Sequence, residues 1–313
     1  MRFLGLLLLL ISTLSFGQEY IGADGPTFNV TKNLTDAPRA LGLVLPDDWG
    51  KKDRTVKLAP MFEGDLPAKF DWRDKGLTPI RDQGSCGSCW SFSAAATLSD
   101  VLKLHGVGSL DLSEQYWVDC TKGSYGCSGG WYHDVFRDVK SDGVVKEESW
   151  PYKAKDQKCP SGIPHFMKIK DYSELASGVP DIETIKRAIY TYGPVSVAVA
   201  VAGRFSSYSG GIYNESSSGS VNHAVNLVGW DDTVQPAHWI MRNSWGSRWG
   251  EDGYMRIAYG SRKIGYAATY IDYNGAVPHD EPNPTPTPDP EPDPCPPCPE
   301  CTFWVWFKSI FGG

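Results

Sequence analysis

The apolar positions of this chain follow a helical spacing in its first half and a strand-like spacing in its second half. We predict a helix over residues 89–105, capped by Ser88, and another over residues 181–192. From residue 195 onward, apolar side chains alternate with small ones. Strands are predicted over residues 195–201, 223–230, 239–242 and 253–259. Helices followed by strands indicate an α+β fold with two lobes, and a ligand cleft is expected between the lobes.

The composition of the 313 residues is that of an ordinary globular protein. Hydrophobic residues make up 41% and charged residues 21%, which excludes a wholly disordered, collagenous or coiled-coil chain. The net charge of −7 excludes the basic footprint of a nucleic-acid-binding protein. Much of this charge falls in residues 275–313, so the rest of the chain is nearly neutral.

The N-terminus has the pattern of a secretory signal peptide. Arg2 precedes an apolar run over residues 3–11, and Ser15 and Gly17 are the small residues expected before a cut at Gln18. The apolar run is much shorter than the ~20 residues that span a membrane, and no other segment is long enough. We therefore predict cleavage of residues 1–17 and a secreted or extracytoplasmic protein, with lysosomal, periplasmic and cell-surface delivery all left open.

The C-terminal part differs from the rest in composition. Residues 275–299 are rich in proline and acidic residues, which favours an extended linker. The final residues, 300–313, are rich in aromatics, and three cysteines two residues apart (Cys295, Cys298 and Cys301) lie at the junction. Zinc usually takes four ligands, and no nearby histidine supplies the fourth. Inter-chain disulfides and attachment to a surface through the aromatic cluster remain open.

The body of the chain contains an odd number of cysteines, so disulfides alone leave one thiol over. Residues 83–90 read QGSCGSCW. A redox dithiol is disfavoured because no strand precedes it, and a zinc knuckle because no second close pair follows. Cys89 opens the predicted helix, where the N-terminal dipole favours a thiolate, and Cys86 is then free to form a disulfide.

A thiolate nucleophile needs a proton partner and a group that orients this partner. His223 stands at the head of the apolar strand over residues 224–230, and Asn243 follows twenty residues later, close to Trp245. An asparagine in this place can accept the imidazole N–H beneath an aromatic cover. These residues predict a nucleophilic Cys–His–Asn site.

Four motifs together resemble those of the papain-like cysteine proteases (the papain/cathepsin family). They are QGSCGSCW at residues 83–90, GCSGG at 126–130, NHA at 222–224 and NSWG at 243–246. His223 and Asn243 follow Cys89 by 134 and 154 positions. The resemblance covers residues 66–274. It implies a helical lobe over about residues 75–175 and an antiparallel, β-barrel-like lobe over about residues 176–274, with the active-site cleft between them.

The resemblance also implies a role for each catalytic residue. Cys89 is the expected nucleophile and His223 its proton partner, so that the two form a thiolate–imidazolium pair. Asn243 orients the imidazole, and Trp245 shields this hydrogen bond. Gln83 is expected to donate its side-chain N–H, beside the backbone N–H of Cys89, to the oxyanion of the tetrahedral intermediate.

Further positions are implied for substrate binding and for disulfides. Gly129 and Gly130 are expected to bind an extended substrate backbone, although a Gly-Gly turn after a disulfide would also explain them. The pocket for the second residue before the cut is expected to be apolar, formed by Tyr132, Ala198, Val221, Ala224 and Thr269. The implied disulfides are Cys86–Cys127 and Cys120–Cys159. No metal or cofactor is implied.

The resemblance implies a secreted cysteine endopeptidase that hydrolyses peptide bonds through a thioester on Cys89. Its partners would be protein and peptide substrates. No insertion narrows the cleft within residues 131–151, which favours an endopeptidase. A catalytically inactive binding module and a transpeptidase that uses the same nucleophile are the alternatives. Residues 18–65 form a short propeptide-like segment without a helical pattern, and turns and loops are predicted around residues 24–26 and 45–48.

Overall fold

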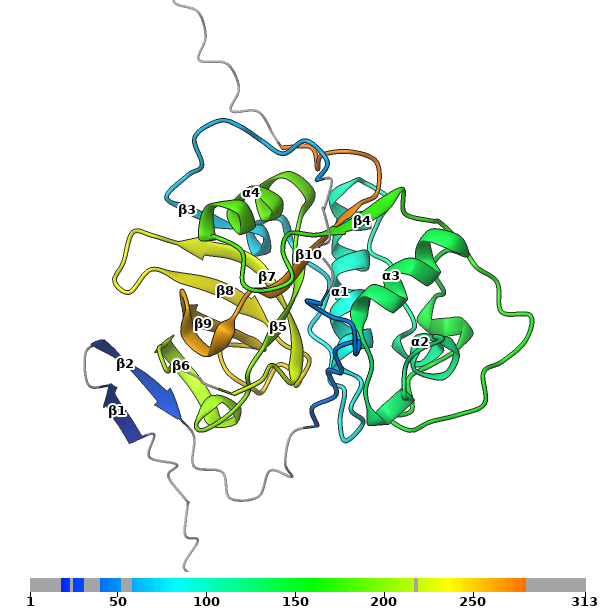
Figure 1. The fold of residues 1–313 in the computed structure, drawn as a ribbon, viewed down its shortest axis with the longest axis horizontal. Helices are drawn as coiled ribbons and strands as arrows, with labels where there is room; N and C mark the ends of the chain where they lie inside the picture. Colours follow the sequence, from blue (N-terminus) through cyan, green and yellow to red (C-terminus); the bar gives the residue numbers. More distant parts are fainter. Residues whose placement is uncertain (1–17, 23–24, 31–39, 52–57, 217–218, 280–313) are drawn as a thin grey trace, which may run out of the picture. The chain divides into compact units, whose positions relative to one another are not determined.

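The computed structural model describes residues 18–22, 25–30, 40–51, 58–216 and 219–279. Within these ranges, helices pack against a mainly antiparallel sheet (Figure 1), as the predicted α+β fold with two lobes requires. None of the helices in these ranges is long and apolar enough to cross a membrane. The predicted signal peptide and the C-terminal tail beyond residue 279 lie outside the described residues.

The helical elements are four α-helices and five short 3-10 helices in the described part of the chain. The α-helices are α1 (Cys89–Leu104), α2 (Glu114–Cys120), α3 (Tyr132–Ser141) and α4 (Ile182–Tyr192). The 3-10 helices are η1 (Trp72–Lys75), η2 (Gly126–Ser128), η3 (Glu147–Ser149), η4 (Phe205–Ser207) and η5 (Ser261–Lys263).

The described strands form one sheet in the order β1-β2-β6-β9-β8-β7-β5-β10-β4, and β3 pairs with β7. Among these pairs, only β6 and β9 run parallel. The bounds are β1 (Gln18–Gly22), β2 (Gly25–Val30), β3 (Lys69–Asp71), β4 (Asp171–Glu174), β5 (Val195–Val199), β6 (Tyr208–Tyr213), β7 (His223–Asp231), β8 (His238–Arg242), β9 (Tyr254–Ala258) and β10 (Tyr266–Asp272).

Helix α1 is buried along most of its length because it packs against both lobes, with α2 and α3 on one side and β5, β7 and β10 on the other. Its polar residues therefore need partners inside the protein. Ser93 Oγ donates to Val225 O at 2.9 Å, and Asn226 Nδ2 donates to Thr97 Oγ1 at 2.7 Å. These bonds join α1 to the sheet and fix the helix at the boundary between the lobes.

The predicted elements are present, and their ends differ for local reasons. Ser88 occupies the N-cap position of α1 but makes no side-chain cap, because its hydroxyl hydrogen-bonds Tyr152 Oη at 2.6 Å. Helix α4 begins one residue later than predicted, because Asp181 is its cap and accepts from Thr184 N at 2.8 Å. Strand β5 ends at Val199 and is buried along its whole length.

The prediction of turns and loops around residues 24–26 is wrong in part, because β2 begins at Gly25. Strand β2 pairs with β1 on one side and with the edge of β6 on the other, where Phe28 lies opposite Gly211. One neighbour of this strand, β1, is adjacent in sequence, whereas the other, β6, is distant and is not revealed by local sequence. In the described parts of residues 18–65 there is no helix, as expected.

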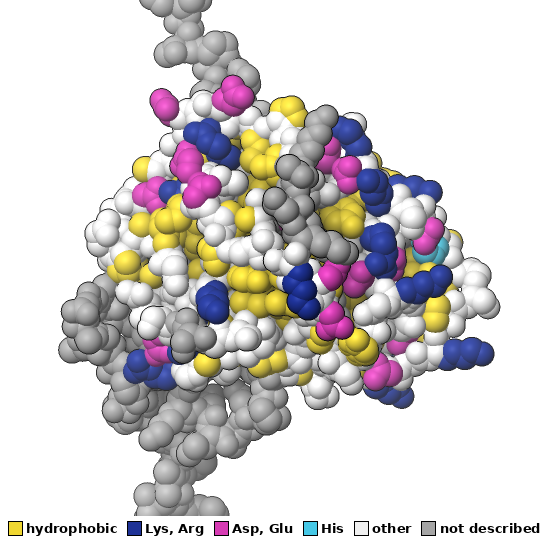
Figure 2. All heavy atoms as spheres, viewed as in Figure 1, with side chains coloured by type: hydrophobic (Ala, Val, Ile, Leu, Met, Phe, Trp, Pro, Cys, Tyr) yellow, Lys and Arg dark blue, Asp and Glu magenta, His cyan; other side chains and the backbone are white. Residues whose placement is uncertain are grey.

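The face shown in Figure 2 differs between the two lobes. Charged side chains gather over the helical lobe and at the upper left of the view, whereas hydrophobic side chains gather over the strands below and near the junction of the lobes. Two buried apolar clusters lie beneath, one centred on the sheet and α4, the other on α1 and α3. The candidate site lies where these two clusters meet.

Candidate active site between the lobes

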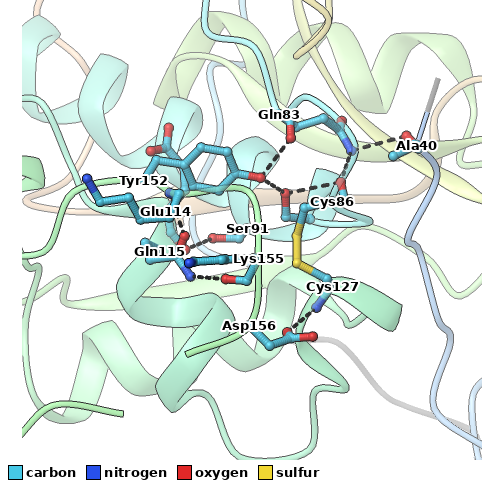
Figure 3. Close-up of a disulfide and its surroundings, with 12 residues drawn as sticks. Ala40, Gln83, Cys86, Ser91, Glu114, Gln115, Cys127, Tyr152, Lys155 and Asp156 are labelled. Atoms are coloured by element: carbon cyan, nitrogen blue, oxygen red, sulfur yellow. Dashed lines mark hydrogen bonds between the residues drawn. A yellow bond between two sulfur atoms is a disulfide. The ribbon is translucent and has the colours of Figure 1, made fainter. Parts of the chain in front are cut away.

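Cys89 is the first residue of α1, and a disulfide holds the turn that precedes it (Figure 3). Cys86 and Cys127 are bonded with Cα atoms 4.7 Å apart, and Gly87 N donates to Cys127 O at 2.9 Å. Asp156 Oδ1 accepts the N–H of Cys127 at 2.7 Å. Cys89 itself is the cysteine left free in the described part of the chain, and it is fully buried.

His223, the first residue of β7, is oriented by Asn243 and covered by Trp245. Its Nε2 atom lies 2.8 Å from Asn243 Oδ1, which also accepts from Ser244 N at 2.8 Å, so Nε2 is the protonated nitrogen. The ring of Trp245 stacks on the imidazole with centroids 4.7 Å apart. His223 Nδ1 is buried and has no hydrogen-bond partner among the described residues, so its lone pair remains available.

The amide of Gln83 is fixed with its N–H groups toward the cleft. Its Oε1 atom accepts from Ser244 Oγ at 2.7 Å. Nε2 donates to two carbonyl oxygens, Cys86 O at 2.9 Å and Ala40 O at 3.1 Å, and because a carbonyl oxygen can only accept, this end of the amide is the nitrogen (Figure 3). The carbonyl of Ala40 therefore already accepts a hydrogen bond from Gln83 Nε2, the group predicted to donate to the oxyanion. Sequence reasoning did not identify Ser244, although it directly follows Asn243.

Residues 40–44, shown in blue in Figure 1, run between the lobes and hydrogen-bond to both. Gly130 N donates to Gly42 O at 2.9 Å, and Val44 N donates to Gly130 O at 3.0 Å, which forms a parallel bridge around Leu43. On the strand side, Leu43 N donates to Asn222 O at 3.3 Å. The sequence predicts that the backbone of a substrate binds at Gly130. In this structure, residues 42–44 of the chain itself make the hydrogen bonds to Gly130.

The two glycines of the GCSGG motif are needed both for packing and for this close approach. A Cβ atom on Gly130 would lie 2.6 Å from the Trp90 ring. Gly129 has a φ of +128°, and a Cβ atom there would lie 2.6 Å from Val44 and 2.9 Å from Gly42 O. The absence of side chains at these two positions therefore serves the packing against Trp90 and the close approach of residues 42–44, and substrate binding at them stays a prediction.

The side chain of Leu43 lies in a buried apolar pocket. Leu43 is only 8% exposed. It belongs to the same buried cluster as four of the residues expected at the pocket, namely Tyr132, Ala198, Val221 and Ala224. Thr269 is fully buried beside Tyr132, since both side chains donate to Ala267 O, and its hydroxyl also lies 2.6 Å from His133 Nε2. Ala267 and Ile271 from β10 join the cluster and were not predicted.

Burial shifts the pKa values of both Cys89 and His223. It raises the pKa of the Cys89 thiol to about 12, although backbone N–H groups, first that of Ala224 and then that of Gly42, favour the thiolate. It lowers the pKa of His223 to about 4, and the hydrogen bond to Asn243 opposes this shift. Burial thus favours the uncharged thiol and the uncharged imidazole while residues 40–44 cover Cys89.

The structure forms both implied disulfides, since Cys120 and Cys159 are also bonded, with Cα atoms 4.9 Å apart. This second bridge ties α2 to the loop that follows η3. Within the described ranges, no group of three His, Cys, Asp or Glu side chains is arranged to hold a metal ion.

Comparison with known proteins gives consistent matches. The family model described as "Papain family cysteine protease" matches residues 66–273. Cathepsin K of Mus musculus is 37% identical over 223 residues, which is 69% of this chain and 67% of that protein. A cathepsin L-like protein of Caenorhabditis elegans is 40% identical over 276 residues, which is 83% of this chain and 77% of that protein.

Solved structures of similar proteins have the same architecture. Digestive procathepsin L2 proteinase from the larval midgut of Tenebrio molitor is 32% identical, with a TM-score of 0.68 over 78% of this chain and 84% of that chain. The bromelain protease of Ananas comosus, solved in complex with the E64 inhibitor, is 36% identical, with a TM-score of 0.61 over 67% of this chain and 100% of that chain.

Proposed function

This chain belongs to the papain family of cysteine proteases, and from this premise we propose that it is the inactive precursor of an endopeptidase in which Cys89 is the nucleophile and His223 its proton partner. The papain-like two-lobe fold and the cysteine endopeptidase activity predicted from the sequence are confirmed. The observation that supports the assignment of roles is the Ala40 carbonyl on Gln83 Nε2, because a peptide backbone already lies where a substrate must bind.

The proposed reaction proceeds in two stages. His223 Nδ1 takes the proton of the Cys89 thiol, and the sulfur attacks the carbonyl carbon of the substrate. The C–N bond breaks as His223 returns the proton to the leaving amine, which leaves a thioester on Cys89. Water, losing a proton to His223, then attacks the thioester and releases the acid and the free thiol. Asn243 and Trp245 hold the imidazole in position throughout.

Gln83 stabilises the charge that develops on the substrate oxygen. Its amide is held by Ser244 before substrate arrives, so no reorganisation is needed as the oxyanion forms. The backbone N–H of Cys89, at the start of α1, is the second proposed donor. Gly129 and Gly130 bind the backbone of the substrate, and the pocket that holds Leu43 takes a hydrophobic side chain at the second residue before the cut.

Residues 18–65 act as the inhibitory propeptide in this proposal. The support comes from residues 40–44, which cover Cys89, accept a hydrogen bond from Gln83 and fill the pocket with Leu43. Their removal would let water and substrate reach Cys89 and His223, and the thiolate–imidazolium pair could then form. The mature catalytic domain would be residues 66–274.

The N-terminal signal is proposed to export the protein, and the two disulfides are of the kind that persists outside the reducing cytosol. Residues 275–299 would act as a spacer. The aromatic residues within positions 300–313, together with Cys295, Cys298 and Cys301 at the junction, would attach the enzyme to a surface or to a second chain.

The test is mass spectrometry after reaction with an epoxide thiol inhibitor, together with peptide hydrolysis. Wild-type protein, Cys89→Ala and His223→Ala are compared, each as the full chain and after loss of residues 18–65. We expect a single adduct on Cys89 in the processed wild type, slow reaction of the full chain, and no hydrolysis by either variant. Folded, reduced and processed protein that gives neither adduct nor hydrolysis would refute the proposal and favour a binding module.

A further inference from the structure

Residues 214–216 read Asn-Glu-Ser, the pattern Asn-X-Ser with X other than proline, at which the asparagine of an exported protein can receive an N-linked glycan. They directly follow strand β6, which ends at Tyr213. A pattern of three residues is short enough to occur by chance. The surroundings of these residues therefore decide whether they form a modification site.

The middle residue of the three, Glu215, is fixed to the body of the protein. Its carboxylate accepts from Arg204 Nε and from Tyr213 Oη, each at 2.7 Å, and forms an ion pair with Arg262. Its backbone is held as well, because Ser261 Oγ donates to Glu215 O at 2.8 Å and Arg262 N donates to the same oxygen at 3.0 Å. Glu215 therefore anchors the three residues.

The two residues that flank this anchor face the solvent. Asn214 and Ser216 are both exposed, whereas only 16% of the Glu215 side chain is exposed. The amide that would receive the sugar and the hydroxyl that the transfer requires are thus accessible together. Both lie on a backbone that Glu215 holds in place, so a bulky group on Asn214 projects into solvent without displacing a buried side chain.

Asn214 is also the one asparagine with this pattern in the proposed mature domain. Within residues 66–274, no other asparagine is followed two positions later by serine or threonine. Two further patterns of this kind begin at Asn29 and Asn33, but both belong to residues 18–65 and would leave with the propeptide. The mature domain thus offers a single position for an N-linked glycan.

A glycan at Asn214 is compatible with the uncut chain. Strand β2 pairs with β6 as far as Gly211, which lies opposite Phe28. Asn214 lies three residues beyond this paired stretch and after the end of β6. A sugar can therefore be attached to it while β2 still covers the edge of β6, that is, before the propeptide is removed.

We propose that Asn214 is an N-glycosylation site of the exported protein and that the mature enzyme carries its single N-linked glycan there. The donor is a lipid-pyrophosphate-linked oligosaccharide of the secretory pathway. Asn214 Nδ2 attacks the anomeric carbon of the first sugar, the C–O bond to the lipid pyrophosphate breaks, and the amide loses one proton as the pyrophosphate leaves. This inference rests on the export proposed above and is independent of the catalytic roles.

The first test maps the peptides of the protein isolated from outside its own cells. An amidase that releases N-linked glycans, used in water enriched in heavy oxygen, converts a glycosylated asparagine into a labelled aspartate. The peptide with Asn214 should carry this label in most copies. The peptide with Asn274, which is exposed but has no serine or threonine two positions later, should carry none. Exported protein with an unlabelled Asn214 would overturn the proposal, and so would protein that is not exported.

Variants produced in the same cells, with their own signal peptide, show which residues are read. Asn214→Gln and Ser216→Ala should each lose the whole mass of the glycan, whereas Ser216→Thr should keep it because threonine supplies the same hydroxyl. Asn274→Gln is the matched control and should also keep it. A glycan that persists in Asn214→Gln would contradict the assignment.

Peptide hydrolysis, measured on the same processed proteins, separates failure of this inference from failure of the proposed function. All four variants should stay within about twofold of wild type, because each changes an exposed residue outside the proposed site. Hydrolysis without a glycan would overturn this inference alone. A glycan without hydrolysis in any of the proteins would support it and refute the proposed catalysis.

Discussion

A single methyl group at Gly42 should open the active site of the full chain. A Cβ atom there would lie 1.7 Å from Gly87 O and 2.2 Å from Gly87 C, where ordinary contacts are 3.4 Å or longer. Gly87 cannot yield, because it stands between the Cys86–Cys127 disulfide and Cys89 and donates its N–H to Cys127 O. In Gly42→Ala, the segment must therefore leave its place by more than an ångström.

The size of the effect follows from the contacts that are lost. Three hydrogen bonds depend on this position: Gly130 N to Gly42 O, Val44 N to Gly130 O, and Gln83 Nε2 to Ala40 O. At about 0.5–1.5 kcal/mol each they contribute about 3 kcal/mol. Burial of the Leu43 side chain contributes about 1.5–3 kcal/mol more. Loss of about 3 kcal/mol, which is roughly half to two thirds of this sum, would raise the fraction of molecules with an open cleft about 100-fold.

The assay is the rate at which iodoacetamide alkylates Cys89 in the uncut chain, followed by peptide mapping so that other thiols do not contribute. Because reaction requires an open cleft, the rate follows the open fraction until opening is no longer limiting. We expect an increase of about 100-fold in Gly42→Ala and none in Asp47→Ala. Rates within twofold of wild type, in a variant that melts at the same temperature, would show that residues 40–44 do not close the cleft.

Three further predictions concern the catalytic domain. Gln83→Ala should lower kcat of the processed enzyme by about 10²–10³ with a much smaller change in KM, measured by steady-state kinetics; equal changes in both would argue against an oxyanion role. Arg242→Met should lower the free energy of unfolding in urea by about 3–5 kcal/mol, because it leaves the carboxylate of Asp100 buried without its partner, now 2.6 Å away. Burial raises the pKa of Glu114 from 4.5 to about 8, so the folded state holds this proton more tightly and stability falls as pH rises through that window. Glu114→Gln should flatten the pH dependence of the free energy of unfolding in urea between pH 4.5 and 8, by about 5 kcal/mol at most over this window; an unchanged slope would refute the shift.

The residues proposed for catalysis could be singled out in the sequence because each stands at an end of a recognisable element or in a motif. Cys89 begins α1 and His223 begins β7, where apolar periodicity starts. Asn243 follows directly after β8. Their spacing along the chain does not fix distances, however. The hydrogen bond from Ser244 to Gln83, which lies 161 positions away, becomes visible only in the folded structure.

Prediction from the sequence missed α2, α3 and β2, although α3 has a clear signal. Helix α3 carries its buried apolar residues at Tyr132, Val135, Phe136 and Val139, a helical spacing that the sequence shows plainly. Helix α2 is only seven residues long, which is too short for periodicity to reveal. Strand β2 pairs with the adjacent β1 and also with the edge of β6, and the second pairing is a tertiary contact that local sequence does not show.

The segment that closes the cleft shows why a function can be invisible in local sequence. Its hydrogen bonds to Gly130 and Asn222 are made by backbone atoms, which every residue except proline supplies in full. The sequence requirement reduces to a glycine at position 42, which fits against Gly87, an apolar side chain at Leu43 and an aromatic one at Trp49. Three such residues spread over eight positions make neither a helical nor a strand-like period. Because so few side chains are required, the closed state is sensitive to a single substitution, such as one at Gly42 that prevents the close approach to Gly87.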